Sequence, residues 1–199
     1  MRILKTHIEE CGDSFYEKAL RYLSYEHKLK ASKYRNREDQ CSCIVGDYML
    51  HKCVSEECNC SLADVRISHS DTGQPYITYP NNTGLYISLS HSGGYVIAAI
   101  NPFQIGIDIE IVRDIDEAVL NHVLSDVEKE YVGRSKRRFF EVWTMKEAYL
   151  KCIGIGITGL DMLKKTDVFH LSSQYNASVF ESTDEYVISI CYLNSECPA

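Results

Sequence analysis

Residues 104–111, with the sequence Gln-Ile-Gly-Ile-Asp-Ile-Glu-Ile, alternate isoleucine with small or acidic residues. Successive side chains of a strand point to opposite faces. The pattern therefore predicts a strand whose isoleucines face the core, while Asp108 and Glu110 project together from the other face. Two adjacent carboxylates repel each other unless a cation lies between them, and oxygen ligands on a rigid strand suit a hard ion such as Mg²⁺. The alternative is an amphipathic strand with a solvated acidic face, and this stretch alone leaves both interpretations open.

The composition is that of a folded globular protein. The chain has 199 residues, of which 45% are hydrophobic and 25% charged, enough for one domain or two small fused halves. The net charge of −7 disfavours a general nucleic-acid binder, because neutralising phosphates requires a basic face. Residues 1–7 lack the apolar core of a signal peptide, and the longest apolar run, near 95–100, is too short to span a membrane. We therefore expect a cytoplasmic protein with neither nucleic acid nor membrane as a partner.

The chain contains nine cysteines, an odd number. Disulfide frameworks are typical of short secreted chains, so we expect reduced thiols. His51, Cys53, Cys58 and Cys60 form a cluster of candidate metal ligands. Because their spacing does not match the ligand pairs of common structural zinc sites, we expect buried thiols followed by a loop. A cysteine-ligated metal site is the alternative.

Hydrophobic periodicity and turn residues divide the remaining sequence into helices and strands. The Gly93–Gly94 pair between two alternating runs indicates a hairpin. Ser90 and His91 then lie near its tip, where hydroxyl and imidazole groups can meet an anionic ligand. No internal repeat is visible. The expected helices are 14–33 with one break, 37–53, 115–124, 125–132 and 138–152, and the expected strands are 64–68, 85–92, 95–100, 104–111, 177–180 and 186–193.

The helix expected over 138–152 presents a second set of charged groups. It contains Trp-Thr-Met-Lys-Glu-Ala-Tyr-Leu-Lys at 143–151 and is expected to end at Gly154 and Gly156. Glu147 and Lys151 are one helical turn apart, so a carboxylate and an ammonium are presented together. On its own, this pair is equally compatible with a surface ion pair that stabilises the helix by about 0.2–0.5 kcal/mol.

Three runs in this order resemble the motifs of the 4′-phosphopantetheinyl transferase family. They are Ser-His-Ser at 90–92, Gly-Ile-Asp-Ile-Glu at 106–110 and Trp-Thr-Met-Lys-Glu-Ala at 143–148. The similarity is greater to the surfactin-synthetase-activating type and covers about 28–157. It implies transfer of the 4′-phosphopantetheine group of coenzyme A to a serine of an apo acyl or peptidyl carrier protein. Mg²⁺ would be the cofactor and 3′,5′-ADP the second product.

The same resemblance implies an α+β fold, a pseudodimer of two similar α/β halves with the active site in the cleft between them. We expect residues 1–101 to form the N-terminal half and to supply contacts to the coenzyme A phosphates. We expect residues 102–199 to form the C-terminal half and to supply the metal-binding and catalytic residues. Because one chain holds both halves, we expect a monomer.

The resemblance also implies roles for individual residues. Asp108, Glu110 and Glu147 would bind Mg²⁺, and Glu147 and Lys151 would be catalytic. Glu147 either completes the metal shell or accepts the serine proton, whereas Lys151 binds the bridging phosphates and stabilises the leaving group. Lys146 is expected to be structural. The residues expected to contact coenzyme A are Lys28, Lys30, Gly73, Gln74, Pro75, Ser90, His91 and Lys151.

Two positions depart from the family's pattern. Many members have lysine where this chain has Gln74, and some have arginine about where it has Ser42. The loss of two cations predicts weaker coenzyme A binding, unless a neighbouring cation such as Lys33 replaces them. The alternative function is therefore a degenerate member that binds coenzyme A or a carrier protein without efficient transfer. Carrier proteins commonly present an acidic helix, so docking on a chain with a charge of −7 is expected to use short-range apolar contacts or a local basic patch such as that at 134–138.

Overall fold

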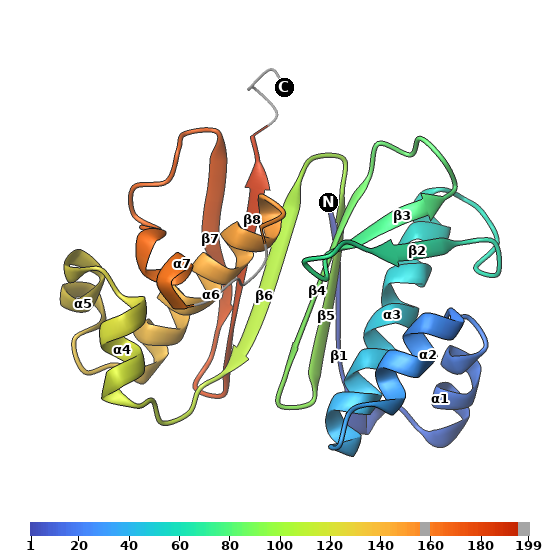
Figure 1. Ribbon diagram of the computed structural model, residues 1–199, viewed down its shortest axis with the longest axis horizontal. Coiled ribbons are helices and arrows are strands. Elements are labelled where there is room, and N and C mark those ends of the chain that lie inside the picture. Colours follow the sequence, from blue (N-terminus) through green and yellow to red (C-terminus); the bar gives the residue numbers. More distant parts are fainter. Residues whose placement is uncertain (156–159, 195–199) are drawn as a thin grey trace.

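The computed structural model describes residues 1–155 and 160–194 and contains two three-stranded antiparallel sheets (Figure 1). The first sheet contains β1 (Arg2–His7), β5 (Tyr95–Asn101) and β4 (Tyr86–Ser92) in that order, and the second contains β6 (Ile105–Ile111), β8 (Tyr186–Leu193) and β7 (Tyr175–Ser182). In each sheet the first strand of the half pairs with the last strand, and the last two strands form a hairpin. The topology is therefore repeated, and the predicted α+β pseudodimer is confirmed.

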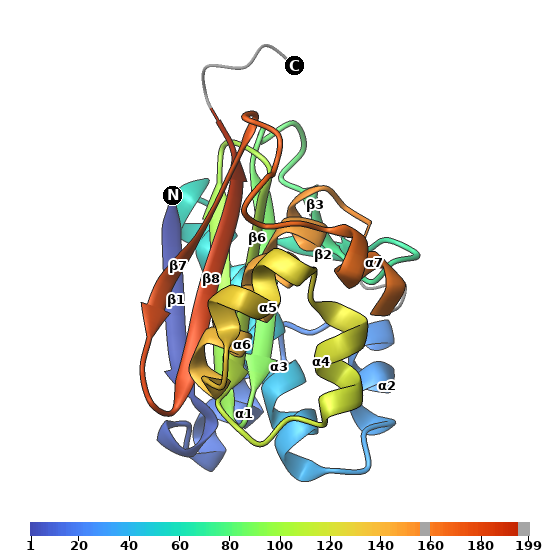
Figure 2. The same cartoon turned by 90° about the vertical axis from the view of Figure 1, so that its left-hand side faces the viewer.

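One long helix packs on each sheet: α3 (Arg37–Glu57) on β4 and β5, and α6 (Lys136–Cys152) on β6 and β8. The other helices are α1 (Asp13–Leu20), α2 (Tyr25–Ser32), α4 (Glu117–Val123), α5 (Asp126–Val132) and α7 (Leu160–Lys165), with a 3₁₀ turn at Ile8–Glu10. Seen from the side, β1, β7 and β8 lie toward one edge of the molecule and α2 and α4 toward the other (Figure 2). Across residues 1–155 and 160–194, none of the helices is long and apolar enough to cross a membrane.

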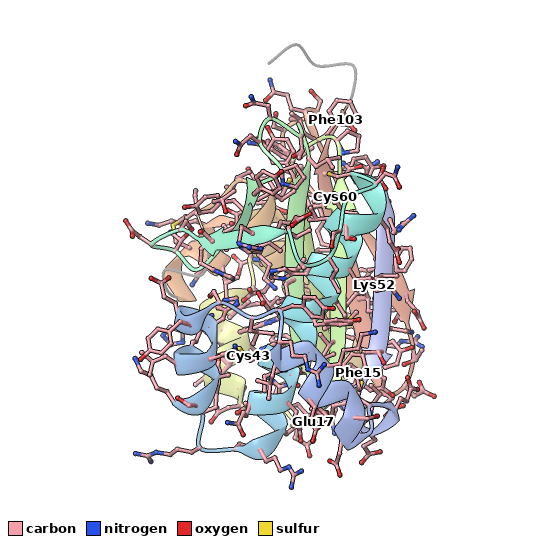
Figure 3. All side chains as sticks on the ribbon, turned by 90° about the vertical axis from the view of Figure 1, so that its right-hand side faces the viewer. Phe15, Glu17, Cys43, Lys52, Cys60 and Phe103 are labelled. Carbon is pink, nitrogen blue, oxygen red and sulfur yellow. The ribbon has the colours of Figure 1, made fainter. Side chains whose placement is uncertain are left out.

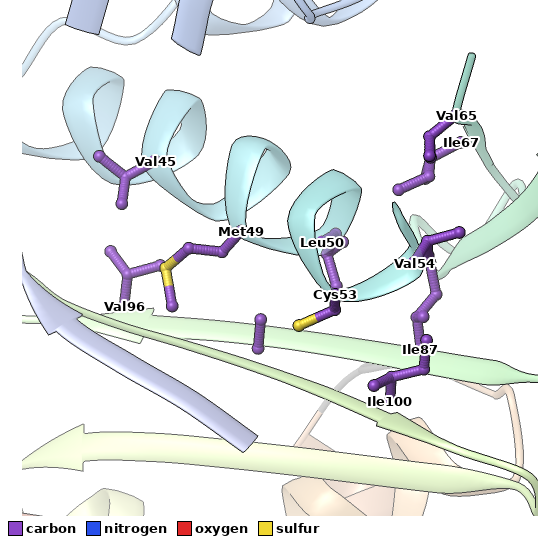
Figure 4. Packing of buried hydrophobic residues seen from close by; sticks show 11 residues of the cluster. Val45, Met49, Leu50, Cys53, Val54, Val65, Ile67, Ile87, Val96 and Ile100 are labelled. Atoms are coloured by element: carbon purple, nitrogen blue, oxygen red, sulfur yellow. The ribbon is translucent and has the colours of Figure 1, made fainter. Parts of the chain in front are cut away.

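Helix α3 is buried on two sides, which explains its long apolar run. One side packs on β4 and β5, and the other side packs on α1 and α2. Lys52 lies on its exposed side (Figure 3). Met49, Leu50 and Cys53 point from the helix toward the strands, where the core also contains Ile87 (Figure 4). The N-terminal half thus has a hydrophobic core of its own.

The ends of α6 follow from local sequence. The hydroxyl of Ser135 accepts a hydrogen bond from the backbone N of Arg138 at 3.3 Å and so caps the first turn. At the other end Gly154 has a left-handed φ of +77°, and its N–H bonds to the carbonyl of Lys151 at 3.2 Å. The predicted end at Gly154 is confirmed, and Gly156 lies outside the described residues.

The sequence predicted most of the helices and strands that flank the junction between the halves. The hairpin of β4 and β5 turns at Gly93 and Gly94, which have φ values of +55° and +80°, as the glycine pair indicated. Three elements were not predicted: β1, α7 and the strand β3 (Pro75–Tyr79), which pairs with β2 (Arg66–His69). β1 is stabilised by pairing with β5, about ninety residues away in the chain, and such a partner leaves no local signal.

Candidate active site at the junction of β4, β6 and α6

Strands β4 and β6 meet through a row of serine side chains. Ser88, Ser90 and Ser92 lie on one face of β4 because they are two residues apart. The Ser88 hydroxyl accepts a hydrogen bond from a backbone N–H of β6 at 3.0 Å. The Ser90 hydroxyl donates to Asp108 Oδ1 at 2.7 Å, and the Ser92 hydroxyl donates to Glu110 Oε2 at 2.8 Å. The N-terminal half therefore orients both acidic side chains of β6.

Helix α6 approaches β6 at Gly106, where the two backbones are in contact. A Cβ at this position would lie 1.9 Å from the carbonyl O of Ala148 and 2.5 Å from the backbone N of Cys152. Only glycine permits so close an approach. A hydrogen bond of 2.7 Å between the hydroxyls of Thr144 and Ser189 also holds α6 on β8. As a result, the polar residues of α6 face the acidic residues of β6.

Asp108 and Lys151 form an ion pair across this contact. Lys151 Nζ lies 2.7 Å from Asp108 Oδ1, and it also donates a hydrogen bond of 3.2 Å to the carbonyl of Ile107. Asp108 is only 4% exposed. Burial raises the pKa of its carboxyl group, and the positive charge of Lys151 opposes this shift.

Glu147 lies near this pair in an equally buried position, being 3% exposed. Its Oε2 atom is buried and accepts no hydrogen bond from any residue that the structure describes. Burial, followed by the negative charge of Asp108, raises the pKa of Glu147 to about 8, although Lys151 acts in the opposite direction. The carboxyl groups of Asp108 and Glu147 thus repel each other in a site where water screens them little.

Glu110, the third predicted metal ligand, is less buried than the other two. Its Oε2 atom accepts the hydrogen bond from Ser92 and forms an ion pair with Arg113 at 2.8 Å. The guanidinium of Arg113 also lies 5.2 Å from the ring centroid of Phe140. The sequence did not indicate Arg113 as a partner of this carboxylate. Serines at every second position of β4 indicate a polar face of this strand, but a role was predicted only for Ser90.

The side chains at this site fit a divalent cation, although they do not form a complete set of metal ligands. Among residues 1–155 and 160–194, no group of three or more His, Cys, Asp or Glu side chains is arranged to hold a metal ion. However, Asp108 Oδ2 and Glu147 Oε2 are both buried oxygens without a hydrogen-bond donor in the described part of the chain. Hard divalent ions prefer such carboxylate oxygens. A cation between them would offset the repulsion, and Glu110 could join after release from Arg113.

The predicted coenzyme A contacts lie on several elements of the N-terminal half. Burial lowers the pKa of His91, and the nearby charges of Lys151 and Lys30 act in the same direction. Lys30 also lines a pocket of about 340 Å³ together with His69. Lys28 is two residues from Lys30, which on a helix places it on a different side, and it does not line this pocket. The structure therefore brings Lys30 and Lys151 toward His91, but not Lys28.

Gly73 and Gln74 lie in the turn between β2 and β3, and Pro75 is the first residue of β3. Gln74 and Pro75 line a second pocket, of about 300 Å³, together with Gly154 at the end of α6. The side-chain amide of Gln74 donates a hydrogen bond of 2.9 Å to the carbonyl of Lys151. Ser42, the other departure from the family's pattern, is buried on α3 and is 2% exposed.

Lys146 is separate from this site. Its Nζ atom is fully buried, 2.7 Å from Glu128 Oε2, and also donates to the carbonyls of Val123 and Leu163. It thus ties α6 to α5, in agreement with the structural role expected for it. Glu128 as its partner was not predicted.

The cysteine cluster is spread over different environments. Cys53 points into the core of the N-terminal half (Figure 4), whereas Cys60 follows the end of α3 (Figure 3). His51 instead donates a hydrogen bond of 2.8 Å from Nδ1 to the carbonyl of Asp47, one turn earlier on α3. The eight cysteines in the described part of the chain are free thiols. This arrangement gives no support to a cysteine-ligated metal at His51, Cys53, Cys58 and Cys60.

We predict that Gly106→Ala destabilises the protein by about 3 kcal/mol, because the new methyl group collides with the α6 backbone rather than with a flexible side chain. Gly12→Ala is the matched control, since a Cβ there meets no atom within 4 Å, and its cost should stay below about 1 kcal/mol. Urea unfolding of the two variants measures both values. Equal losses would contradict the close contact of α6 with β6.

Comparison with known proteins assigns both halves to one family. The model described as "4'-phosphopantetheinyl transferase superfamily" matches residues 104–191, and the model "4'-phosphopantetheinyl transferase, N-terminal" matches residues 11–103. The 4′-phosphopantetheinyl transferases ffp of Bacillus subtilis and Sfp of Bacillus subtilis strain 168 are 27% and 28% identical to this chain over 147 residues. Each match covers 71% of this chain and 65% of the relative. A further 4′-phosphopantetheinyl transferase of Bacillus subtilis is 24% identical over 184 residues, covering 85% of this chain and 81% of its own.

The match thus spans slightly less than two thirds of the Sfp and ffp proteins. The two family models together extend from residue 11 to residue 191 and meet between β5 and β6. From its motifs, its repeated topology and these matches, the chain belongs to the 4′-phosphopantetheinyl transferase superfamily and is of the Sfp-like type.

Proposed function

We propose that this protein transfers the 4′-phosphopantetheine group of coenzyme A to a serine of an apo acyl or peptidyl carrier protein, with release of 3′,5′-ADP. The observation that carries this proposal is the placement of Asp108, Glu147 and Lys151 together at the contact of β6 with α6. Two carboxylates and one ammonium in a buried site suit the displacement of one phosphate oxygen by another, because negative charge increases on the oxygens around phosphorus.

We propose Asp108, Glu110 and Glu147 as the residues that hold Mg²⁺. The support is chemical: the three side chains offer carboxylate oxygens, and two of these oxygens are buried without a donor among residues 1–155 and 160–194. A bound Mg²⁺ would neutralise charge on the pyrophosphate of coenzyme A and align it for in-line attack. The ion pair with Arg113 and the hydrogen bond from Ser92 both use Oε2 of Glu110, so they compete with a metal for that oxygen.

Lys151 is proposed to contact the bridging phosphates and to stabilise the leaving 3′,5′-ADP. Its ammonium group already lies in the site, held by Asp108 and by the carbonyl of Ile107. Glu147 is compatible with two roles, as a metal ligand or as the group that accepts the serine proton. Both roles require its carboxyl group at the reacting centre, and its buried position near Asp108 supports them.

Coenzyme A is proposed to lie across the two halves, with residues 1–101 contacting its phosphates and residues 102–199 carrying the chemistry. The proposed contacts are Lys28, Lys30, Gly73, Pro75, Ser90, His91 and Lys151. Gln74 was also expected from the sequence to be a contact, but its side-chain amide is bonded to the carbonyl of Lys151. His91 is supported by its position near the positive charges of Lys151 and Lys30, which together with burial lower its pKa. Ser90 contributes by holding Asp108, and its hydroxyl is already used for that purpose.

The carrier protein is proposed to dock beside the C-terminal half, near the basic residues at 134–138 that precede and begin α6. Arg137 is about half exposed and lies 3.8 Å from Glu141, and Arg138 lies over the ring of Tyr131. These cations offer an acidic helix a local attraction on a chain with a net charge of −7. Because both halves of the site are in one chain, we propose that the protein acts as a monomer.

The test of transfer is the intact mass of apo acyl and peptidyl carrier proteins after incubation with this protein, coenzyme A and Mg²⁺. We expect a gain of one phosphopantetheine group on at least one carrier. Asp108→Ala should abolish the gain, because it removes both the proposed metal ligand and the partner of Lys151. Asp126→Ala is the matched control, since Asp126 is fully exposed at the start of α5, and it should transfer like the unmodified protein.

If no carrier gains mass while coenzyme A still binds, the degenerate binding protein becomes the better description. Equal transfer by the Asp108→Ala and unmodified proteins would instead remove β6 from the active site. The first result contradicts the proposed transfer, whereas the second contradicts only the proposed site. Calorimetric titration shows whether coenzyme A still binds.

Charge reversal at Arg137 and Arg138, both to Glu, should slow transfer roughly tenfold at low salt and weaken its dependence on salt, because steering is lost. The control is the double reversal of Arg21 and Lys52, exposed cations of the N-terminal half, which changes the net charge equally. Rates at several salt concentrations provide the measurement. Equal slowing by both double variants would point to net charge alone and contradict docking at this patch.

A further inference from the structure

The turn between β2 and β3 contacts the last turn of α6 through two hydrogen bonds. Gln74 Nε2 donates to the carbonyl of Lys151 at 2.9 Å, and Thr72 Oγ1 donates to the carbonyl of Gly154 at 3.4 Å. Thr72 and Gln74 belong to the N-terminal half, while Lys151 and Gly154 belong to the C-terminal half. These contacts therefore connect the two halves at the end of the helix that carries Lys151.

The turn is held in shape before it meets α6. The backbone N of Ser70 donates to the carbonyl of Gln74 at 2.9 Å, and the backbone N of Gln74 donates to the Ser70 hydroxyl at 3.1 Å. Gly73 has a φ of +83°, a left-handed conformation that favours glycine, and its N–H bonds to the carbonyl of Ser70 at 2.8 Å. Gln74 is thus presented from a turn whose backbone is already fixed, so little further backbone freedom is lost when its side chain bonds to α6.

The last turn of α6 has a carbonyl suited to this contact. The final carbonyls of a helix lack partners within the helix, and a carbonyl oxygen can accept two hydrogen bonds. The carbonyl of Lys151 accepts one from the backbone N of Gly154 at 3.2 Å and the other from Gln74. A Cβ at Gly154 would lie 3.0 Å from Gln74 Oε1, so the Gln74 amide lies directly against this turn.

Lys151 is consequently held at both ends. Its backbone is fixed by Gln74, and its ammonium group is fixed by Asp108 at 2.7 Å and by the carbonyl of Ile107. We propose that Gln74 is a positioning residue for Lys151, and that it acts through this backbone hydrogen bond rather than by contacting a phosphate of coenzyme A. This inference rests on the proposed function of Lys151 and assigns to Gln74 a role other than a contact with coenzyme A.

The kinetic test compares variants at position 74 in carrier-protein transfer. Gln74→Ala should lower kcat by roughly 3- to 10-fold, as expected for loss of one hydrogen bond, and leave the KM for coenzyme A within about twofold. The carboxylate of the Gln74→Glu variant cannot donate a hydrogen bond, so the kcat of this variant should fall at least as far. Gln74→Lys keeps a donor and should restore kcat. Gln104→Ala is the control, because Gln104 lines the same pocket and its side chain makes no hydrogen bond within the described residues.

A rise in the KM for coenzyme A with unchanged kcat in Gln74→Ala would overturn the proposal, because that pattern belongs to a phosphate contact. The proposal would also be overturned if Gln74→Lys bound coenzyme A more tightly while Gln74→Ala kept the kcat of the unmodified protein.

Hydrogen exchange of the free protein tests the same contact without activity. In Gln74→Ala, backbone amides at 70–74 and at 153–155 should exchange faster together, whereas Gln104→Ala should leave both segments unchanged. Unchanged exchange in Gln74→Ala would overturn the connection between the halves. If the unmodified protein transfers to no carrier, the proposed function fails, and the exchange measurement still decides whether Gln74 holds the end of α6.

Discussion

The burial of two carboxyl groups, Asp108 and Glu147, beside each other is the constraint on which the rest of the site depends. Removing charged groups from water is costly unless they gain partners, and like charges add to this cost. Asp108 gains Lys151 and Ser90, but each carboxyl group keeps one buried oxygen without a donor among the described residues. A cation bound between these two oxygens would therefore be strongly stabilised. Burial and the charge of Asp108 raise the pKa of Glu147 to about 8.

The surrounding structure is arranged to keep these groups in place. Gly106 allows the backbones of α6 and β6 to touch, which sets the separation of the helix from the strand. The serines of β4 orient the acidic side chains of β6 from the other half of the molecule. Neither half contains all of these contacts, so the site depends on the junction of the two repeated units. This dependence gives a physical reason for two similar halves to occur in one chain.

Much of this arrangement was readable from the sequence. The alternation at 104–111 predicted a strand with Asp108 and Glu110 on one face, and the spacing of Glu147 and Lys151 predicted one helix face. Local periodicity carries such information directly. The contacts that cross the junction were not predicted, because Ser92 with Glu110 and Gln74 with Lys151 depend on how distant segments pack. The repeat of topology was expected only from the family resemblance and not from an internal sequence repeat, since strand order survives after sequence similarity between the halves is lost.

The most direct test of the central claim is calorimetric titration of coenzyme A into the protein, with Mg²⁺ present and again with EDTA. If the carboxylates of β6 and α6 bind coenzyme A through a shared divalent ion, affinity should be clearly higher with Mg²⁺. Glu147→Gln should lose most of this difference while the protein stays folded. Equal affinity under both conditions would contradict the account, because the buried carboxylates would then have no part in holding the substrate.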